Sequence, residues 1–365
     1  MKIAYLLTHD IRQEDGVTKK ITQQAKIWRA MGHEVEVFAI INVKEPLSDY
    51  CNGHRLFHNS MWLAEPRNLV KSIRSYKPEI IYLRFEPFKP FMNLLVRQYP
   101  TVIEINSDDI SEYRLRAKNN IKGKLLYYYN LLTRRILLKR VAGLIGVTEE
   151  LLTLPENRKS RKLSLVVPNG IDLKQFGTLK VPKDNSIPQL VFLCSNDQPW
   201  QGTDKLIRLA RNSIGKLAFH IIGVSPDKTA PPNMTYYGYL HKEGYEAIMK
   251  LSDIGIGTLA LHRKNMNEAC PLKVREYLAY GLPVIIGYND TAFMGQEGLP
   301  NWMLEIPNTE NNIDDYLMQI IDFSYKMKNF VLPKKNISFI DYNELEEKRL
   351  SFMASILALQ RHEKE

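Results

Sequence analysis

Apolar and polar positions alternate along the chain in two series of short apolar runs and longer helical stretches. In the first series, residues 2–7 form an apolar run, Asp15-Gly16 interrupts it, and residues 17–31 have apolar positions at helical spacing. A second apolar run follows Gly32 at residues 34–40. The order strand, glycine turn, helix, strand is that of a βαβ unit. Further buried parallel strands are predicted at residues 80–83, 101–105, 144–147 and 165–167.

The second series begins after the polar stretch at residues 180–188. It predicts strands at 190–194, 218–222, 254–258 and 284–286, and helices at 203–211, 243–251 and 271–280. Two such series predict an α/β protein with two doubly wound parallel-sheet domains. We expect these domains to cover residues 1–172 and 173–341. The tail at residues 342–365 has a helical pattern, and it either packs back across the domains or caps its own domain.

The composition indicates a globular protein, but it does not identify the binding partner. The 365 residues suit two domains, and 44% hydrophobic with 25% charged residues is typical of a globular protein. Lysine and arginine outnumber aspartate and glutamate by 50 to 40, which favours a nucleotide, a nucleic acid or an anionic membrane as partner. Cys51, Cys194 and Cys270 form no C-x-x-C pair, so a zinc site is not expected. No apolar stretch has the length of a signal peptide core or a membrane span, which predicts a cytoplasmic protein.

The segment from Glu268 to Glu276 carries the sharpest chemistry. Pro271 suits the first turn of a helix, and Gly281 suits its end. The free N–H groups near Leu272 and Lys273 would attract a phosphate, and the lysine adds a full charge. Two glutamates therefore flank one predicted anion site, where a carboxylate accepts hydrogen bonds from sugar hydroxyls. The alternative is an amphipathic helix with an exposed glutamate.

This segment resembles the E-x7-E motif of retaining GT-B glycosyltransferases of the family-4 type. Three more segments resemble the same family in its order and spacing, namely Asp15-Gly16-Val17-Thr18 with Gly32-His33-Glu34-Val35, Val167-Pro168-Asn169-Gly170-Ile171-Asp172, and Trp200-Gln201-Gly202. The resemblance implies a GT-B fold, with two Rossmann-like domains facing a cleft. It also implies that the N-terminal domain binds the acceptor and the C-terminal domain binds the nucleotide sugar.

The resemblance assigns roles to individual residues. Glu268 would contact hydroxyls of the transferred sugar, Glu276 the nucleotide ribose, and the N–H groups of Leu272 and Lys273 the pyrophosphate. Gly16 would allow close approach to the donor. Three further residues, Gln201, Gly202 and Arg263, complete the predicted donor-binding set.

Two basic residues that the resemblance leads us to expect are missing from this sequence. Gln201 stands where a lysine is expected, and the turn after residue 194 holds no arginine. Lys273, Arg263 or Lys205 could take over their charge.

The N-terminal half offers Asp108 and Asp109 after a predicted strand, where ligands of parallel sheets bind. Either could orient the acceptor hydroxyl as a catalytic residue, or could cap the helix that follows. Family members often have a histidine in this region, and here Asn106 replaces it. Residues 114–140 contain nine basic residues, three consecutive tyrosines and no acid. That composition suits an anionic membrane surface on the inner face of the plasma membrane, or the solvated face of a packed helix, more than a nucleic acid.

The sequence thus predicts a retaining glycosyltransferase. It would move a sugar from a nucleoside-diphosphate sugar to a glycan or lipid-linked acceptor in cell-surface polysaccharide synthesis. No cofactor or metal is expected, since the chain lacks an Asp-x-Asp sequence. The alternative is a non-catalytic GT-B binding or partner subunit, motivated by Gln201 and the missing arginine.

Overall fold

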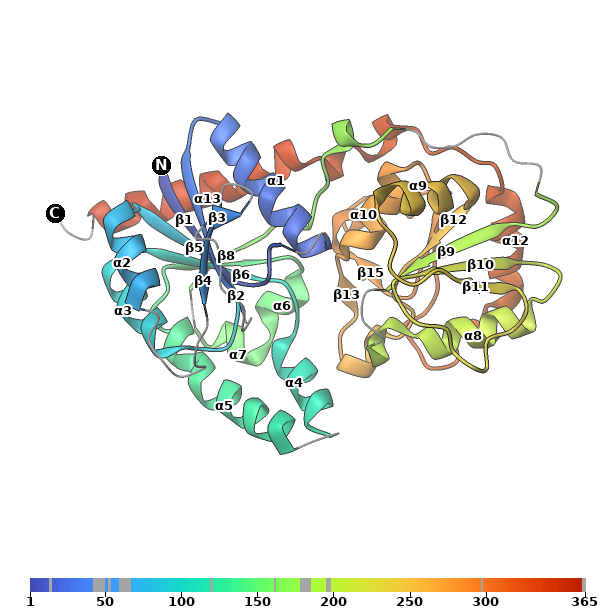
Figure 1. Ribbon diagram of the computed structural model, residues 1–365, viewed down its shortest axis with the longest axis horizontal. Helices are drawn as coiled ribbons and strands as arrows, with labels where there is room; N and C mark the ends of the chain where they lie inside the picture. Colours follow the sequence, from blue (N-terminus) through green and yellow to red (C-terminus); the bar gives the residue numbers. More distant parts are fainter. Residues whose placement is uncertain are drawn as a thin grey trace. The chain divides into compact units, whose positions relative to one another are not determined.

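The computed structural model describes residues 1–12, 15–41, 50–51, 54–58, 67–118, 121–160, 162–177, 185–194, 198–296 and 298–362. The chain divides into two compact units, one comprising Met1–Pro168 with Tyr342–Glu365 and the other Asn169–Asp341 (Figure 1). Each unit is an α/β unit built on a largely parallel sheet. The polar stretch at residues 180–188 lies outside the described residues up to residue 184.

The N-terminal sheet has eight strands among the described residues, in the order β3-β4-β2-β1-β5-β6-β7-β8. All neighbours are parallel except β3 and β4. The strand order reverses between β1 and β5, so their carboxyl ends mark the switch point where ligands of such sheets bind. The strands are β1 (Lys2–Thr8), β2 (Glu34–Ile41), β3 (Tyr50–Cys51), β4 (His54–His58), β5 (Ile80–Arg84), β6 (Thr101–Ile105), β7 (Gly143–Gly146) and β8 (Leu163–Val166).

Helices surround this sheet, and the C-terminal helix α13 belongs to the same unit. Figure 1 shows α1 and α13 on one side of the strands and α5 on the other. The helices are α1 (Gly16–Ala30), α2 (Arg67–Tyr76), α3 (Pro90–Gln98), α4 (Asp109–Ala117), α5 (Ile121–Leu138), α6 (Glu149–Thr153), α7 (Pro155–Arg158) and α13 (Tyr342–His362).

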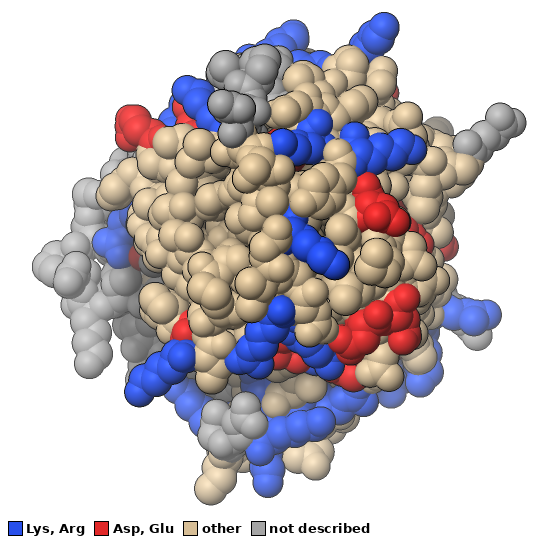
Figure 2. All heavy atoms as spheres, turned by 90° about the vertical axis from the view of Figure 1, so that its right-hand side faces the viewer, with Lys and Arg blue, Asp and Glu red and all other residues tan. Residues whose placement is uncertain are grey.

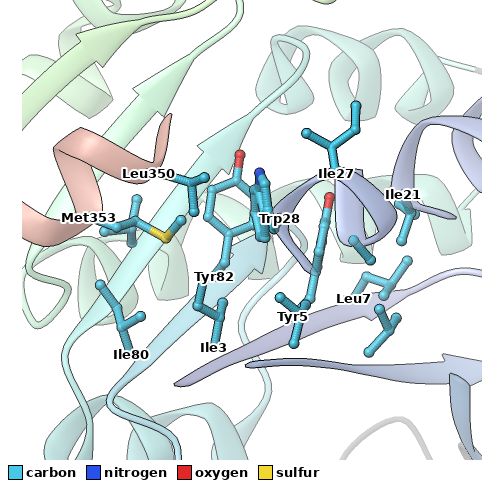
Figure 3. Close-up of a cluster of buried hydrophobic side chains, with 14 of the residues drawn as sticks. Ile3, Tyr5, Leu7, Ile21, Ile27, Trp28, Ile80, Tyr82, Leu350 and Met353 are labelled. Atoms are coloured by element: carbon cyan, nitrogen blue, oxygen red, sulfur yellow. The ribbon is translucent and has the colours of Figure 1, made fainter. Parts of the chain in front are cut away.

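An aromatic cluster forms the core under α1 and α13. The rings of Tyr5 and Trp28 stack at 5.6 Å, and Tyr82 meets both edge-on at 5.0 Å. Leu350 and Met353 of α13 reach into this cluster (Figure 3). Such burial of large apolar side chains is the main force that holds α13 on the sheet.

Several buried charged groups in this core are paired with one another. In α13, Arg349 bonds Glu346 at 2.8 Å and the carbonyl of Val167 at 2.9 Å. Lys20 of α1 lies 2.9 Å from Glu104 of β6. Burial lowers the pKa of Lys20 to about 8, whereas the nearby Lys20, Arg349 and Arg84 outweigh burial and lower the pKa of Glu104. Satisfied charges of this kind fix one arrangement of α1, β6 and α13.

The C-terminal sheet has six parallel strands among the described residues, in the order β11-β10-β9-β12-β14-β16. Its order reverses between β9 and β12, so the switch point lies at the ends of these two strands. The elements are β9 (Gln189–Leu193), β10 (Ala218–Ile222), β11 (Met234–Tyr236), β12 (Ile254–Ile256), β14 (Val284–Ile286), β16 (Met303–Glu305), a separate pair β13 (Glu268–Ala269) with β15 (Asn289–Asp290), and helices α8 (Thr203–Asn212), α9 (Lys242–Leu251), α10 (Leu272–Ala279), α11 (Asn312–Asp315) and α12 (Leu317–Met327).

Candidate functional site

Helix α10 presents an uncapped, positively polarised N-terminus in the C-terminal unit. Pro271 has extended dihedral angles and precedes the first helical residue, Leu272, so it is the N-cap rather than part of the first turn. No side chain caps this end, and the first turn contains no acid. Gly281, with a φ of +83°, follows the helix and lets the chain turn into β14. The first amides of α10 thus lack a side-chain cap, and an anion could bind them.

Lys273 brings a full charge to the switch point of this sheet. Its Nζ donates to the carbonyl of Leu193, the last residue of β9, at 3.1 Å and to Oε1 of Gln201 at 2.8 Å. The ammonium also lies 4.0 Å from the ring centroid of Phe192. Loss of water around the amine lowers the pKa of Lys273 to about 8. This lysine is thus a partly buried cation at the place where doubly wound sheets bind ligands.

The two predicted glutamates lie in the same unit, Glu268 before α10 and Glu276 within it. Glu268 is half-buried in β13, which pairs with β15 through Asn289. Glu276 is half-buried on α10 and accepts a hydrogen bond from the hydroxyl of Tyr245 on α9. Burial and the neighbouring carboxylate raise the pKa of Tyr245 well above its usual value, so this hydroxyl stays a donor near neutral pH. The structure therefore fixes one oxygen of Glu276 from α9.

Gly202 has a steric reason to be glycine. Its φ is +77°, and a Cβ there would lie 2.9 Å from Cβ of Leu259. The amide of Leu259 donates to the carbonyl of Gln201 at 3.2 Å, which holds the turn against the strand end. Gln201 is positioned beside Lys273 by this close packing. The preceding residues 195–197, where the sequence lacks the expected arginine, lie outside the described residues.

The other two candidate cations have partners within the protein. Arg263 bonds Asp204 at 2.7 Å and Glu310 at 2.6 Å, and these hydrogen bonds raise its pKa further. Lys205 is buried and donates to the carbonyl of Leu259 at 3.2 Å and to Asn312 at 3.1 Å. A bound anion would compete with two carboxylates for Arg263, so Lys273 is the better placed cation.

A buried ion pair holds the segment from Glu268 to Glu276 in place. Sequence inspection did not predict this pair. Arg275 of α10 binds Asp290 of β15 at 2.5 Å and donates to the carbonyl of Asn169 at 2.8 Å. Cys270 joins them, since its sulfur lies 2.7 Å from Arg275 and 3.0 Å from the amide of Asn169. Asn169 is therefore tied to the residues just before α10 and to Arg275 within it. The sequence did carry one signal of a buried ion pair, namely an arginine between the apolar helix positions Val274 and Tyr277.

In the N-terminal unit, both predicted aspartates have structural partners. Asp108 caps α4, accepting from the amide of Ser111 at 3.1 Å, as the alternative interpretation proposed. Asp109 pairs with Arg134 of α5 at 2.5 Å and accepts from Asn130 at 2.5 Å, while burial raises its pKa. Gly16 is the first residue of α1, directly after its N-cap Asp15. The structure thus gives both carboxylates a role in holding helices.

The switch point of the N-terminal sheet carries a pair that sequence inspection missed. Lys89 bonds Glu86 at 2.5 Å and Oγ1 of Thr8, the last residue of β1, at 2.6 Å. Both charged side chains are buried, and no described residue hydrogen-bonds Oε1 of Glu86. A buried carboxylate oxygen with no such bond is a candidate for binding a hydroxyl.

Solved structures with the same architecture cover almost the whole chain. HepE of Anabaena in complex with UDP and glucose has a TM-score of 0.67 at 13% identity, covering 97% of this chain and 100% of HepE. The lipopolysaccharide outer core galactosyltransferase WaaB has a TM-score of 0.62 at 12% identity, covering 97% and 100%. The chain has a GT-B fold.

Another GT-B neighbour is the pneumococcal O-GlcNAc transferase GtfA in complex with UDP and GlcNAc, with a TM-score of 0.61 at 11% identity, covering 98% of this chain and 99% of GtfA. No model of a protein family matches the sequence, and no curated protein matches it. At these identities the shared GT-B fold is what the likeness establishes, and the chemistry must be argued from the site.

Proposed function

We propose that this GT-B protein is a retaining glycosyltransferase that uses a nucleoside-diphosphate sugar. The observation that carries the proposal is the cation at the C-terminal switch point, where Lys273 and the uncapped start of α10 converge. A diphosphate is the ligand that such a site fits, because the helix dipole and the ammonium both favour negative charge. The HepE and GtfA structures contain UDP, which makes UDP the first nucleotide to test.

Different residues of the C-terminal unit bind different parts of the donor. The N–H groups of Leu272 and Lys273 and the ammonium of Lys273 bind the pyrophosphate, with Gln201 and Gly202 shaping the turn beside it. Glu276 binds the nucleotide ribose, and Glu268 binds hydroxyls of the transferred sugar. This division follows from their order along β13 and α10 and from the resemblance to the E-x7-E motif.

The reaction breaks the bond between the anomeric carbon and the diphosphate oxygen. The acceptor oxygen forms a new bond to that carbon on the same face, and its proton passes to the departing phosphate oxygen. Lys273 and the α10 amides stabilise the charge that grows on the diphosphate as the bond breaks. A preformed cation is useful here because it needs no reorganisation during the reaction.

The acceptor is a glycan or lipid-linked sugar of cell-surface polysaccharide synthesis, and the N-terminal unit binds it. WaaB, an outer core galactosyltransferase, is a neighbour of that kind. Asp108 and Asp109 are engaged in a cap and an ion pair. Glu86 pairs with Lys89 through Oε2 only, and no described residue hydrogen-bonds its Oε1, so Glu86 is the carboxylate better placed to accept the acceptor hydroxyl.

A binding subunit on the same fold remains the second candidate, because Gln201 replaces a family lysine. The test begins with thermal stability of the full chain against UDP, UDP-glucose and UDP-N-acetylglucosamine, since ligand binding to the folded state raises the melting temperature. Release of UDP from the stabilising sugar nucleotide is then measured with and without acceptor oligosaccharides. Binding with turnover supports the transferase, whereas binding without turnover supports the subunit. No stabilisation by any nucleoside diphosphate would contradict both.

A further inference from the structure

Helix α5 exposes a row of apolar side chains to solvent. Four large apolar side chains, Ile121, Leu125, Tyr128 and Leu132, are 76%, 68%, 59% and 74% exposed. Their spacing of three or four residues places them in one row along the helix. Single exposed apolar residues are ordinary, but a continuous row marks a surface that contacts another phase or molecule.

The inner face of α5 is held by polar contacts of Arg134 and Asn130, together with the buried Leu137 and Leu138 near the end of the helix. Arg134 is buried and bonds Asp109 at 2.5 Å and Asn157 at 2.6 Å, and its guanidinium stacks 4.1 Å from the ring centroid of Phe85. Asn130, also buried, bonds Asp109. The helix is thus anchored to α4 and α7 without using its apolar row. The alternative interpretation, a packed helix with only a solvated basic face, does not describe these positions, because the apolar row is exposed and Arg134 is a buried anchor.

Basic side chains border the apolar row. Lys124 and Arg135 fall on one side of it and Lys122 on the other, at about 100° of rotation per residue, and all three are exposed. Residues 114–140 contain no acid, and exposed Arg114, Arg116 and Lys118 end the neighbouring α4. By contrast, acidic and basic side chains are mixed on the face of the molecule shown in Figure 2.

We propose that α5 docks this protein on an anionic lipid bilayer, with the apolar row inserted among the headgroups. An apolar row bordered by lysine and arginine is the pattern of a helix that lies in the membrane interface, and tyrosine favours the same depth. No described helix is long and apolar enough to span a membrane, so the contact is peripheral. Pairing of α5 with a second copy would bring two basic borders together, which like-charge repulsion opposes.

The test is sedimentation of the full chain with vesicles of phosphatidylglycerol and phosphatidylcholine, against vesicles of phosphatidylcholine alone. Wild type should bind the anionic vesicles at low salt, and added salt should weaken binding. Leu125→Ser with Leu132→Ser should lower the partition coefficient at least about tenfold, since two apolar side chains no longer leave water. Lys122→Gln with Lys124→Gln and Arg135→Gln should lower it by a similar factor and reduce its salt dependence.

The matched control carries Ile214→Ser and Met318→Ser, which remove apolar side chains that are 54% and 57% exposed in the other unit. It should bind vesicles like wild type, and all variants should keep the wild-type melting temperature. The proposal is overturned if wild type ignores anionic vesicles at low salt, or if the Leu125 and Leu132 variant binds them equally well. It is also overturned if light scattering shows a dimer that this variant dissociates while vesicles are ignored.

Discussion

Nζ of Lys273 lies 2.8 Å from Oε1 of Gln201, at the end of β9. The two residues come from different elements, a helix start and a turn, and are joined only in the fold. Gln201 stands where the family that the sequence resembles carries a lysine, and the ammonium of Lys273 lies one side chain away. Under the proposed function, this ammonium supplies the charge for the diphosphate that the turn lacks.

The Lys273 ammonium should therefore dominate affinity for the diphosphate. Lys273→Met should weaken UDP binding about ten- to a hundredfold, the worth of a hydrogen bond to a charged group. Isothermal titration calorimetry measures it, with Lys242→Met as a control because that lysine is exposed on α9. The exchange variant Gln201→Lys with Lys273→Gln should recover much of the affinity, because it returns an ammonium to the same place. Equal affinity of Lys273→Met and wild type would show that the diphosphate binds elsewhere.

Binding of UDP should also depend on pH through this lysine. Its pKa of about 8 means that it is charged at pH 7 and largely neutral at pH 9. Affinity should thus fall about tenfold between these values as the proton is lost, while the phosphate, with a pKa of roughly 6, stays ionised. In Lys273→Met this decline should disappear. A wild-type affinity that is constant from pH 7 to 9 would argue against an ammonium contact.

Arg275 should matter for stability of the C-terminal unit. Arg275→Met leaves Asp290 buried without its cation, which should lower the free energy of unfolding by about 3–5 kcal/mol. Adding Asp290→Asn should restore part of this loss, because the uncompensated charge is removed. Urea unfolding measures both, with Arg208→Met as the control, whose half-exposed pair with Asp314 should contribute less than about 1 kcal/mol. A loss as small as that of the control would show that the pair does not stabilise the turn at Asn169.

Transfer should proceed without a divalent metal, because α10 and Lys273 supply the positive charge. Sugar transfer should keep its rate in a chelator, and added magnesium or manganese should change it little. Activity that disappears in the chelator and returns with either metal would contradict this scheme.

The strands that the sequence predicted best are short, buried and parallel. Strands β6, β10 and β14 occupy the predicted residues 101–105, 218–222 and 284–286, because such strands are mostly apolar on both faces, with Glu104 and His220 as buried exceptions. The two-residue strands β13 and β15 were not predicted, since so few residues show no period. The pairing of β13 with β15, which positions Glu268, was therefore seen only in the structure.

The candidate site was predictable where one segment holds it and unpredictable where the fold assembles it. The start of α10 could be expected from Pro271 and its end from Gly281, although Pro271 is the N-cap and not part of the first turn. The contact of Lys273 with Gln201 joins residues 72 positions apart, and no spacing indicates it. Likewise Arg134 looked like one more surface charge in a basic segment, because its partner Asp109 is on another helix.

We propose that Glu268 acts on the transferred sugar while Glu276 holds the nucleotide. The most direct measurement is the turnover of sugar transfer by Glu268→Gln and Glu276→Gln beside their calorimetric affinity for free UDP. Glu268→Gln should lower turnover strongly and leave UDP affinity almost unchanged, because free UDP carries no sugar. Glu276→Gln should weaken UDP affinity by about ten- to a hundredfold, while its amide oxygen can still accept from Tyr245. Transfer by Glu268→Gln at the wild-type rate would contradict the account and favour the binding subunit.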